Sequence, residues 1–171
     1  MRLCSLRLAL AAALVAILGR PASAQLAPNA PKDRPVNAAL KCQLDAMYRA
    51  IAPLSAAARA SFPAARQRFA AGLPPGHSLF ATTRLHDADG REEQIFVMVD
   101  SITGPPNAGR IVGRIWSPVQ LVRGYVYRQR VTFDVAELVD WMIARPDGTE
   151  EGNEVGKFLD SYRPPASCTE S

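Results

Sequence analysis

Residues 133–148 read FDVAELVDWMIARPDG, and this stretch decides how the end of the fold is organised. Val139, Trp141 and Ile143 alternate along the chain, which predicts a β-strand with these three side chains on one face. An aspartate beside a tryptophan could mark either a working site or part of a strand. Because a domain of this size needs large apolar anchors, we interpret Trp141 as a core residue on that strand.

Strand signals also precede this stretch. Residues 77–103 contain two β-compatible runs joined by Asp-Ala-Asp-Gly, which predicts a hairpin with Gly90 at positive φ. Both alternating faces of the hairpin carry apolar residues, so we expect it to be central and covered on both sides. The strand predicted at 110–117 contains Gly113, which indicates a bend or bulge. An irregular loop then leads to a strand at 130–134, and a single capped turn follows it.

Helical spacing dominates the segment before the hairpin. Apolar residues recur at helical intervals from Asn37 to Ile51, and Pro53 is expected to end this first helix. A second helix is expected from Ser55, with a kink or a restart at Pro63. A short polar helix is expected at about 153–160. The predicted class is therefore α+β, with two N-terminal helices packed on a bent antiparallel sheet of about five strands. Barrel-like closure of that sheet is left open.

The first residues indicate export. Residues 1–24 contain early arginines, an apolar run and an Ala-x-Ala site, which together predict a cleaved signal peptide; an uncleaved anchor is the alternative. Residues 25–36 are rich in proline and polar groups and are expected to form a flexible leader. A single domain at 37–171 should follow, as a periplasmic or secreted monomer with no stable membrane insertion after signal cleavage.

Removing the signal peptide changes the charge balance. The whole chain has 20 basic and 16 acidic residues, and three of the basic ones, Arg2, Arg7 and Arg20, lie in the signal. The mature protein is therefore nearly neutral. Since it also lacks a long run of like charges, the sequence argues against a nucleic-acid partner and against a polybasic membrane patch.

Two cysteines remain after cleavage, Cys42 and Cys168. In an oxidising compartment this pair predicts one long-range disulfide, with free thiols or an intermolecular bridge as alternatives. His77 and His86 have no metal-ligand spacing, so neither a metal nor a cofactor is expected.

A resemblance adds to this interpretation. The runs EEQIFVMVDSI, GRIVGRIWSPVQL and VTFDVAELVDWMIARPDG follow the helical AMYRAIAPLSAAARASFPAARQRF in that order. Over roughly residues 46–156, the chain resembles a YegJ-like bacterial family of unknown function. The resemblance implies one α+β domain and no particular reaction.

Candidate chemistry is sparse. A small periplasmic hydrolase could use His86 with Ser101 or a nearby acid, although the chain contains no G-x-S-x-G motif. The preferred hypothesis is a non-catalytic module that binds an envelope protein, a peptide or a glycan. Its aromatic binding residues would be Trp116, Tyr125 and Tyr127, of which Trp116 is expected nearest to the surface.

Overall fold

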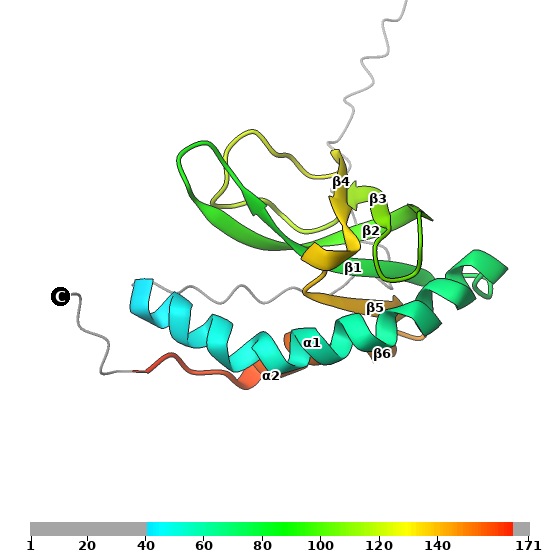
Figure 1. Ribbon diagram of the computed structural model, residues 1–171, viewed down its shortest axis with the longest axis horizontal. Helices are drawn as coiled ribbons and strands as arrows, with labels where there is room; N and C mark the ends of the chain where they lie inside the picture. The colour runs from blue at the N-terminus through cyan, green and yellow to red at the C-terminus, as the bar shows by residue number, and fades with distance from the viewer. Residues whose placement is uncertain (1–40, 166–171) are drawn as a thin grey trace, which may run out of the picture.

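The computed structural model describes residues 41–165, which form one α+β unit (Figure 1). The predicted signal peptide at 1–24, the leader at 25–36 and Cys168 lie outside these residues. The elements in chain order are α1 (Lys41–Ala71), β1 (Ser78–His86), β2 (Glu92–Thr103), β3 (Arg110–Ile115), β4 (Arg130–Asp134), the 3-10 turn η1 (Val135–Glu137), β5 (Asp140–Ala144), β6 (Glu150–Gly152) and α2 (Glu154–Ser161).

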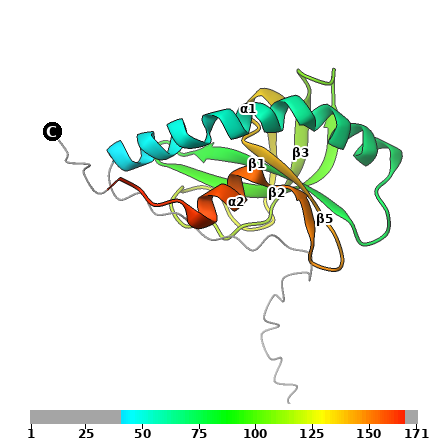
Figure 2. The ribbon, with the colours of Figure 1, turned by 90° about the horizontal axis from the view of Figure 1, so that it is seen from below.

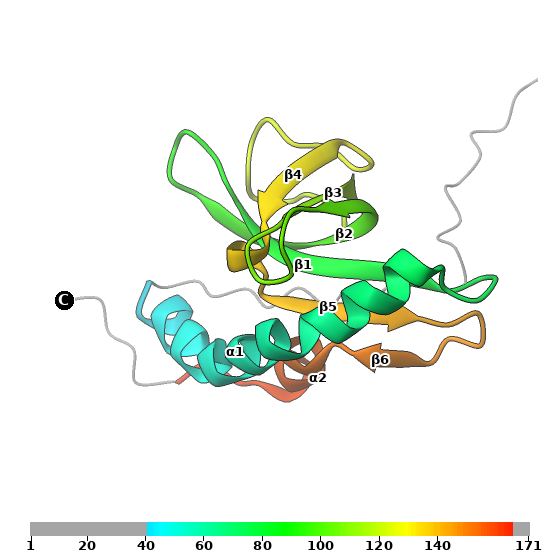
Figure 3. The ribbon, with the colours of Figure 1, turned by 45° about the vertical axis from the view of Figure 1, so that its right-hand side comes forward.

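The strands form one antiparallel sheet in the order β4-β3-β2-β1-β5-β6. The α+β class is confirmed, but the described residues contain six strands where about five were predicted. The sheet is also open, so the barrel-like alternative is wrong. Its strands twist strongly, and β4 and β6 end far from each other (Figure 3). The strand that the sequence missed is β6, because its three residues, Glu150–Gly152, carry no apolar alternation.

The central hairpin agrees with its prediction. β1 and β2 pair antiparallel from Phe80–Met98 to His86–Glu92, and Gly90 in the turn has a φ of 77°. The irregularity expected at Gly113 also occurs, as a register shift in β2 between Val99 and Ser101 opposite this glycine. A Cβ atom on Gly113 would collide with the carbonyl oxygen of Met98, so the close approach of β3 to β2 requires glycine here.

The N-terminal region forms one helix, so the prediction of two helices is wrong. α1 runs without a break through Pro53 and Pro63 and crosses the sheet (Figure 2). A proline inside a helix costs about 3 kcal/mol. Packing outweighs this cost because one stripe of buried residues continues past both prolines. Its members are Met47, Ile51, Ser55, Ala58, Phe62 and Ala65.

Apolar residues fill both sides of the hairpin, as predicted. Leu79, Ala81 and Leu85 of β1 belong to the main core cluster, which includes Phe62 of α1. Phe80, between them in sequence, belongs to a different cluster with Met142 and Ala144. This division follows the period of two along a strand.

Asp140 and Trp141 connect the sheet to both helices, and we call this pair the Asp140–Trp141 junction. Trp141 is 7% exposed, and its Nε1 donates to the Ala58 carbonyl at 3.1 Å and to Ser61 Oγ at 3.0 Å, both in α1. Asp140 is 2% exposed, and its carboxylate accepts from the backbone N–H of Val155 in α2 at 2.7 Å and of Trp141 at 2.8 Å. The pair is therefore structural, and the prediction of Trp141 as a core anchor is confirmed.

Candidate functional site

The three predicted aromatic binding residues do not form one surface. The rings of Trp116 and Tyr127 lie 5.7 Å apart, and the Arg128 guanidinium stacks on both. Tyr125 packs instead against the main core cluster, with its hydroxyl 3.4 Å from the His86 carbonyl oxygen. Trp116 is half-buried and also contacts Phe80. The structure thus brings two of the three residues together and places the third elsewhere.

The proposed pairing of His86 with Ser101 does not form. His86 lies opposite Glu92 at the start of β2, and Ser101 lies opposite Val112 near its other end. Nine residues of extended strand separate these positions, or roughly 30 Å. A nearby acid is present, since Nδ1 of His86 lies 3.5 Å from a carboxylate oxygen of Glu92. Burial raises the pKa of Glu92 above its usual value.

The acidic turn at 87–92 has a structural role. The Asp87 carboxylate accepts from the backbone N–H groups of Asp89, Arg91 and Arg123, and the N–H group of Arg123 is the main cause of its lowered pKa. Within residues 41–165, no group of three His, Cys, Asp or Glu side chains is placed to hold a metal ion. Over the same residues, no helix is both long and apolar enough to cross a membrane.

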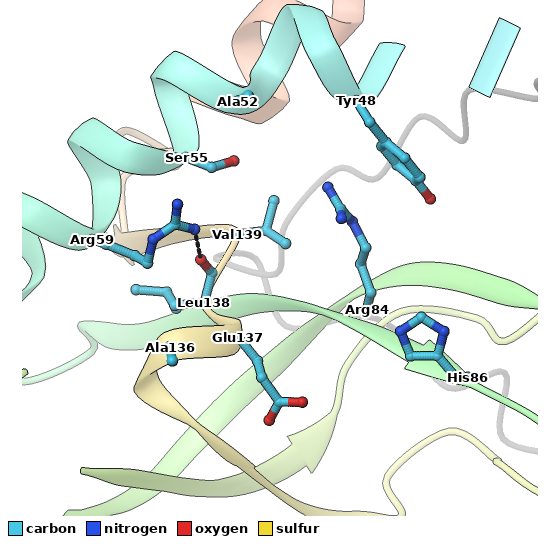
Figure 4. Close-up of a pocket in the computed structure, with 10 residues that line it drawn as sticks. All are labelled: Tyr48, Ala52, Ser55, Arg59, Arg84, His86, Ala136, Glu137, Leu138 and Val139. Atoms are coloured by element: carbon cyan, nitrogen blue, oxygen red, sulfur yellow. Dashed lines mark hydrogen bonds between the residues drawn. The ribbon is translucent and has the colours of Figure 1, made fainter. Parts of the chain in front are cut away.

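A pocket of about 360 Å³ lies between α1, the end of β1 and the chain from η1 to β5 (Figure 4). Its size is at the lower end of the range for small-molecule sites. We call it the arginine pocket because two arginines from different elements line it. Its residues are Tyr48, Ala52, Ser55, Arg59, Arg84, His86, Ala136, Glu137, Leu138 and Val139.

Both arginines lack a carboxylate partner among the ion pairs of the described residues. Arg59 donates from Nη1 to the Leu138 carbonyl at 2.8 Å. The Arg84 guanidinium lies 3.9 Å from the centre of the Tyr48 ring, and Figure 4 shows both side chains extending toward each other. Burial lowers the pKa of Arg84, and the charge of Arg59 lowers it further. Two like charges therefore face one pocket.

Two residues that line the pocket also carry unpartnered polar atoms. Within residues 41–165, five buried side-chain nitrogen or oxygen atoms have no hydrogen-bond partner. Ser55 Oγ and Arg84 Nε belong to residues that line the pocket. Glu92 Oε1 and Gln94 Oε1 belong to the cross-strand partners of His86 and Arg84, so they lie on the same face of the sheet. The fifth atom, Trp116 Nε1, belongs to a residue that packs on Phe80, further along the same face and away from the pocket lining.

The sequence contained a signal for this pocket that the prediction did not use. Arg84 is a charged residue in a strand, LFATTRLH, that was expected to be apolar on both faces. Such a residue needs a partner when it is buried. Arg59 gave no comparable signal, because a charged residue on an amphipathic helix normally faces solvent.

The chain was compared with known proteins in three ways. No family model matches it, and no curated protein or solved structure matches it either. The resemblance to the YegJ-like family therefore stays a prediction. Cys42 lies in the first turn of α1 while Cys168 lies outside the described residues, so their disulfide also stays a prediction.

Proposed function

We propose that this chain is an exported, non-catalytic module that binds a partner macromolecule by an anionic group held in the arginine pocket. The observation that carries the proposal is the pair of guanidinium groups, Arg59 and Arg84, that face one pocket without a carboxylate between them. An oxyanion is the group that a guanidinium binds best, because two N–H donors can meet its two oxygens.

Electrostatics supports this assignment. Partial burial of Arg84 beside Arg59 is unfavourable in the protein alone, as the lowered pKa of Arg84 indicates. An anion between Arg59 and Arg84 would offset the repulsion between their two positive charges. It would also accept a hydrogen bond from Arg84 Nε, which has no partner in the protein. The buried hydroxyl of Ser55, which has no partner, could donate to the same anion.

Binding is favoured over hydrolysis by the groups that surround the pocket. A hydrolase needs a nucleophile hydrogen-bonded to its base. Among the described residues, no serine or threonine hydroxyl is hydrogen-bonded to the His86 ring, whose close contact is with Glu92. In Figure 4, Ser55 and His86 lie on opposite sides of the pocket.

The test is capture of partners from an envelope extract by the mature protein and three variants. Arg84→Gln removes a pocket cation and keeps a polar side chain at this position. Arg130→Gln is the control that changes the charge equally, since Arg130 is exposed at the start of β4. Trp116→Ala tests the aromatic residues separately. We expect Arg84→Gln to reduce specific capture at least tenfold, while Arg130→Gln and Trp116→Ala retain it.

Higher salt should weaken the captured complex, because ions screen charge-dependent contacts. Equal capture by wild type and Arg84→Gln would overturn the proposal. Loss of capture in Trp116→Ala alone would move the binding surface to Trp116 and Tyr127.

A further inference from the structure

We infer that the anionic group is the free terminal carboxylate of a peptide. This inference rests on the proposed function and makes it specific. It depends on three properties of the arginine pocket: its charge balance, the unpartnered donors in it with the unpartnered acceptors on the strand beside it, and its apolar wall.

The charge balance favours a ligand with a single negative charge. Arg59 and Arg84 contribute two positive charges to the pocket lining. Glu137 also lines the pocket, but its carboxylate accepts from the backbone N–H of Asp134 and points away from the two arginines (Figure 4). Glu92, in contact with His86 at the pocket edge, contributes one negative charge beside the pocket. A doubly charged phosphate would be attracted by the arginines but repelled by the carboxylate of Glu92. A single carboxylate bound at the arginines keeps most of the attraction with less repulsion.

The unpartnered atoms include both donors and acceptors. Arg84 Nε can donate, and Ser55 Oγ can donate or accept. Glu92 Oε1 and Gln94 Oε1, on the adjacent strand, can only accept. A simple anion would satisfy the donors and leave the acceptors unpartnered. A peptide end satisfies both kinds, because its carboxylate accepts and its nearby backbone N–H groups donate.

The remaining wall is apolar and suits a small side chain. Ala52 of α1, Leu138 and Val139 line the pocket between the two arginines, and the Tyr48 ring closes it beside Arg84 (Figure 4). A volume of about 360 Å³ exceeds what a bare inorganic ion fills. The last residue of a peptide, with a small side chain such as that of alanine or valine, fits this combination.

The test is isothermal titration calorimetry with matched probes on the mature protein. The probes are the N-acetylated dipeptide of alanine with a free carboxylate, the same dipeptide as its terminal amide, and inorganic phosphate. We expect the free acid to bind at least tenfold more tightly than the amide or phosphate. Arg84→Gln should abolish binding of the acid, while Arg130→Gln should leave it unchanged. The ¹⁵Nε signal of Arg84 should shift on titration in the wild type.

The outcomes separate this inference from the proposed function. If phosphate binds and depends on Arg84 while the acid does not bind, the peptide inference is wrong and the anion-binding function stands. Equal affinity of acid and amide would also overturn the inference. If no probe binds and Arg84→Gln captures partners as well as wild type does, both proposals fail.

Discussion

The Asp140–Trp141 junction and the arginine pocket both place polar groups in the protein interior. They differ in whether those groups have hydrogen-bond partners within the protein. At the junction, the Trp141 Nε1 atom and both carboxylate oxygens of Asp140 have hydrogen-bond partners in the protein. At the pocket, Ser55 Oγ and Arg84 Nε have none. Partnered groups stabilise the fold, whereas unpartnered ones cost stability and are retained at binding sites. The junction is therefore a structural pair, and the unpartnered groups mark the pocket that we propose as the binding site.

The largest expected effect is at the junction. Trp141→Ala should lower the free energy of unfolding by about 3–5 kcal/mol, because it leaves a cavity and removes the link between β5 and α1. Urea unfolding followed by circular dichroism measures the change. Trp116→Ala should cost less than half as much, since Trp116 is only half-buried. Equal losses would contradict the distinction between the two tryptophans.

A pH-dependent effect of similar size is expected at Asp140. Burial raises its pKa from 3.8 to about 6, against the opposing hydrogen bonds from Val155 and Trp141. The folded state therefore holds the proton more tightly than the unfolded chain. This contribution to stability is fully present below pH 3.8 and is lost as the pH rises through about 6. A shift of this size corresponds to roughly 3 kcal/mol.

Asp140→Asn isolates that contribution because asparagine does not titrate. Unfolding free energies of wild type and variant should be measured in urea between pH 4 and pH 7. The stability of the wild type relative to the variant should fall across this range. A constant difference would mean that Asp140 has an ordinary pKa in the folded protein.

At Ser55, a substitution is expected to increase stability instead of lowering it. Ser55→Ala should raise the free energy of unfolding by about 1 kcal/mol, since it removes a buried hydroxyl without a partner and alanine favours helices. Ser61→Ala, six residues further along α1, is the matched control. It should lower stability by about 1 kcal/mol, because Ser61 Oγ accepts from Trp141. Thermal unfolding of the two variants compares them directly; destabilisation by Ser55→Ala would show that its hydroxyl has a partner.

The smallest effect is expected at Trp116. Trp116→Phe should change the free energy of unfolding by less than about 1 kcal/mol, because its Nε1 atom has no hydrogen bond to lose. Trp141→Phe, which loses two hydrogen bonds from the same kind of atom, should cost clearly more. Equal costs, measured by urea unfolding, would remove the contrast between the two side chains.

Local patterns predicted most strands and turns of this protein. The hairpin with Gly90, the irregularity beside Gly113 and the buried Trp141 depend on alternation and glycine chemistry, which act over a few residues. The prediction of two N-terminal helices failed because Pro53 and Pro63 are local signals, while the buried stripe that keeps α1 continuous is a tertiary one.

The candidate site was harder to predict than the fold. Trp116, Tyr125 and Tyr127 are close in sequence, yet the structure separates Tyr125 from the other two. Arg59 and Arg84 are 25 positions apart in sequence and belong to a helix and a strand, yet they line one pocket. Residue type suggests which groups can bind an anion, but only their convergence forms a site.

The sequence by itself determined the α+β class, the central hairpin and the burial of Trp141, because apolar periodicity and turn chemistry are written in consecutive residues. Only the tertiary structure decided that α1 is one helix, that the sheet stays open with six strands, and that two arginines share a pocket. These features depend on contacts between distant segments, and the free energy of those contacts has no counterpart in any short stretch of the chain.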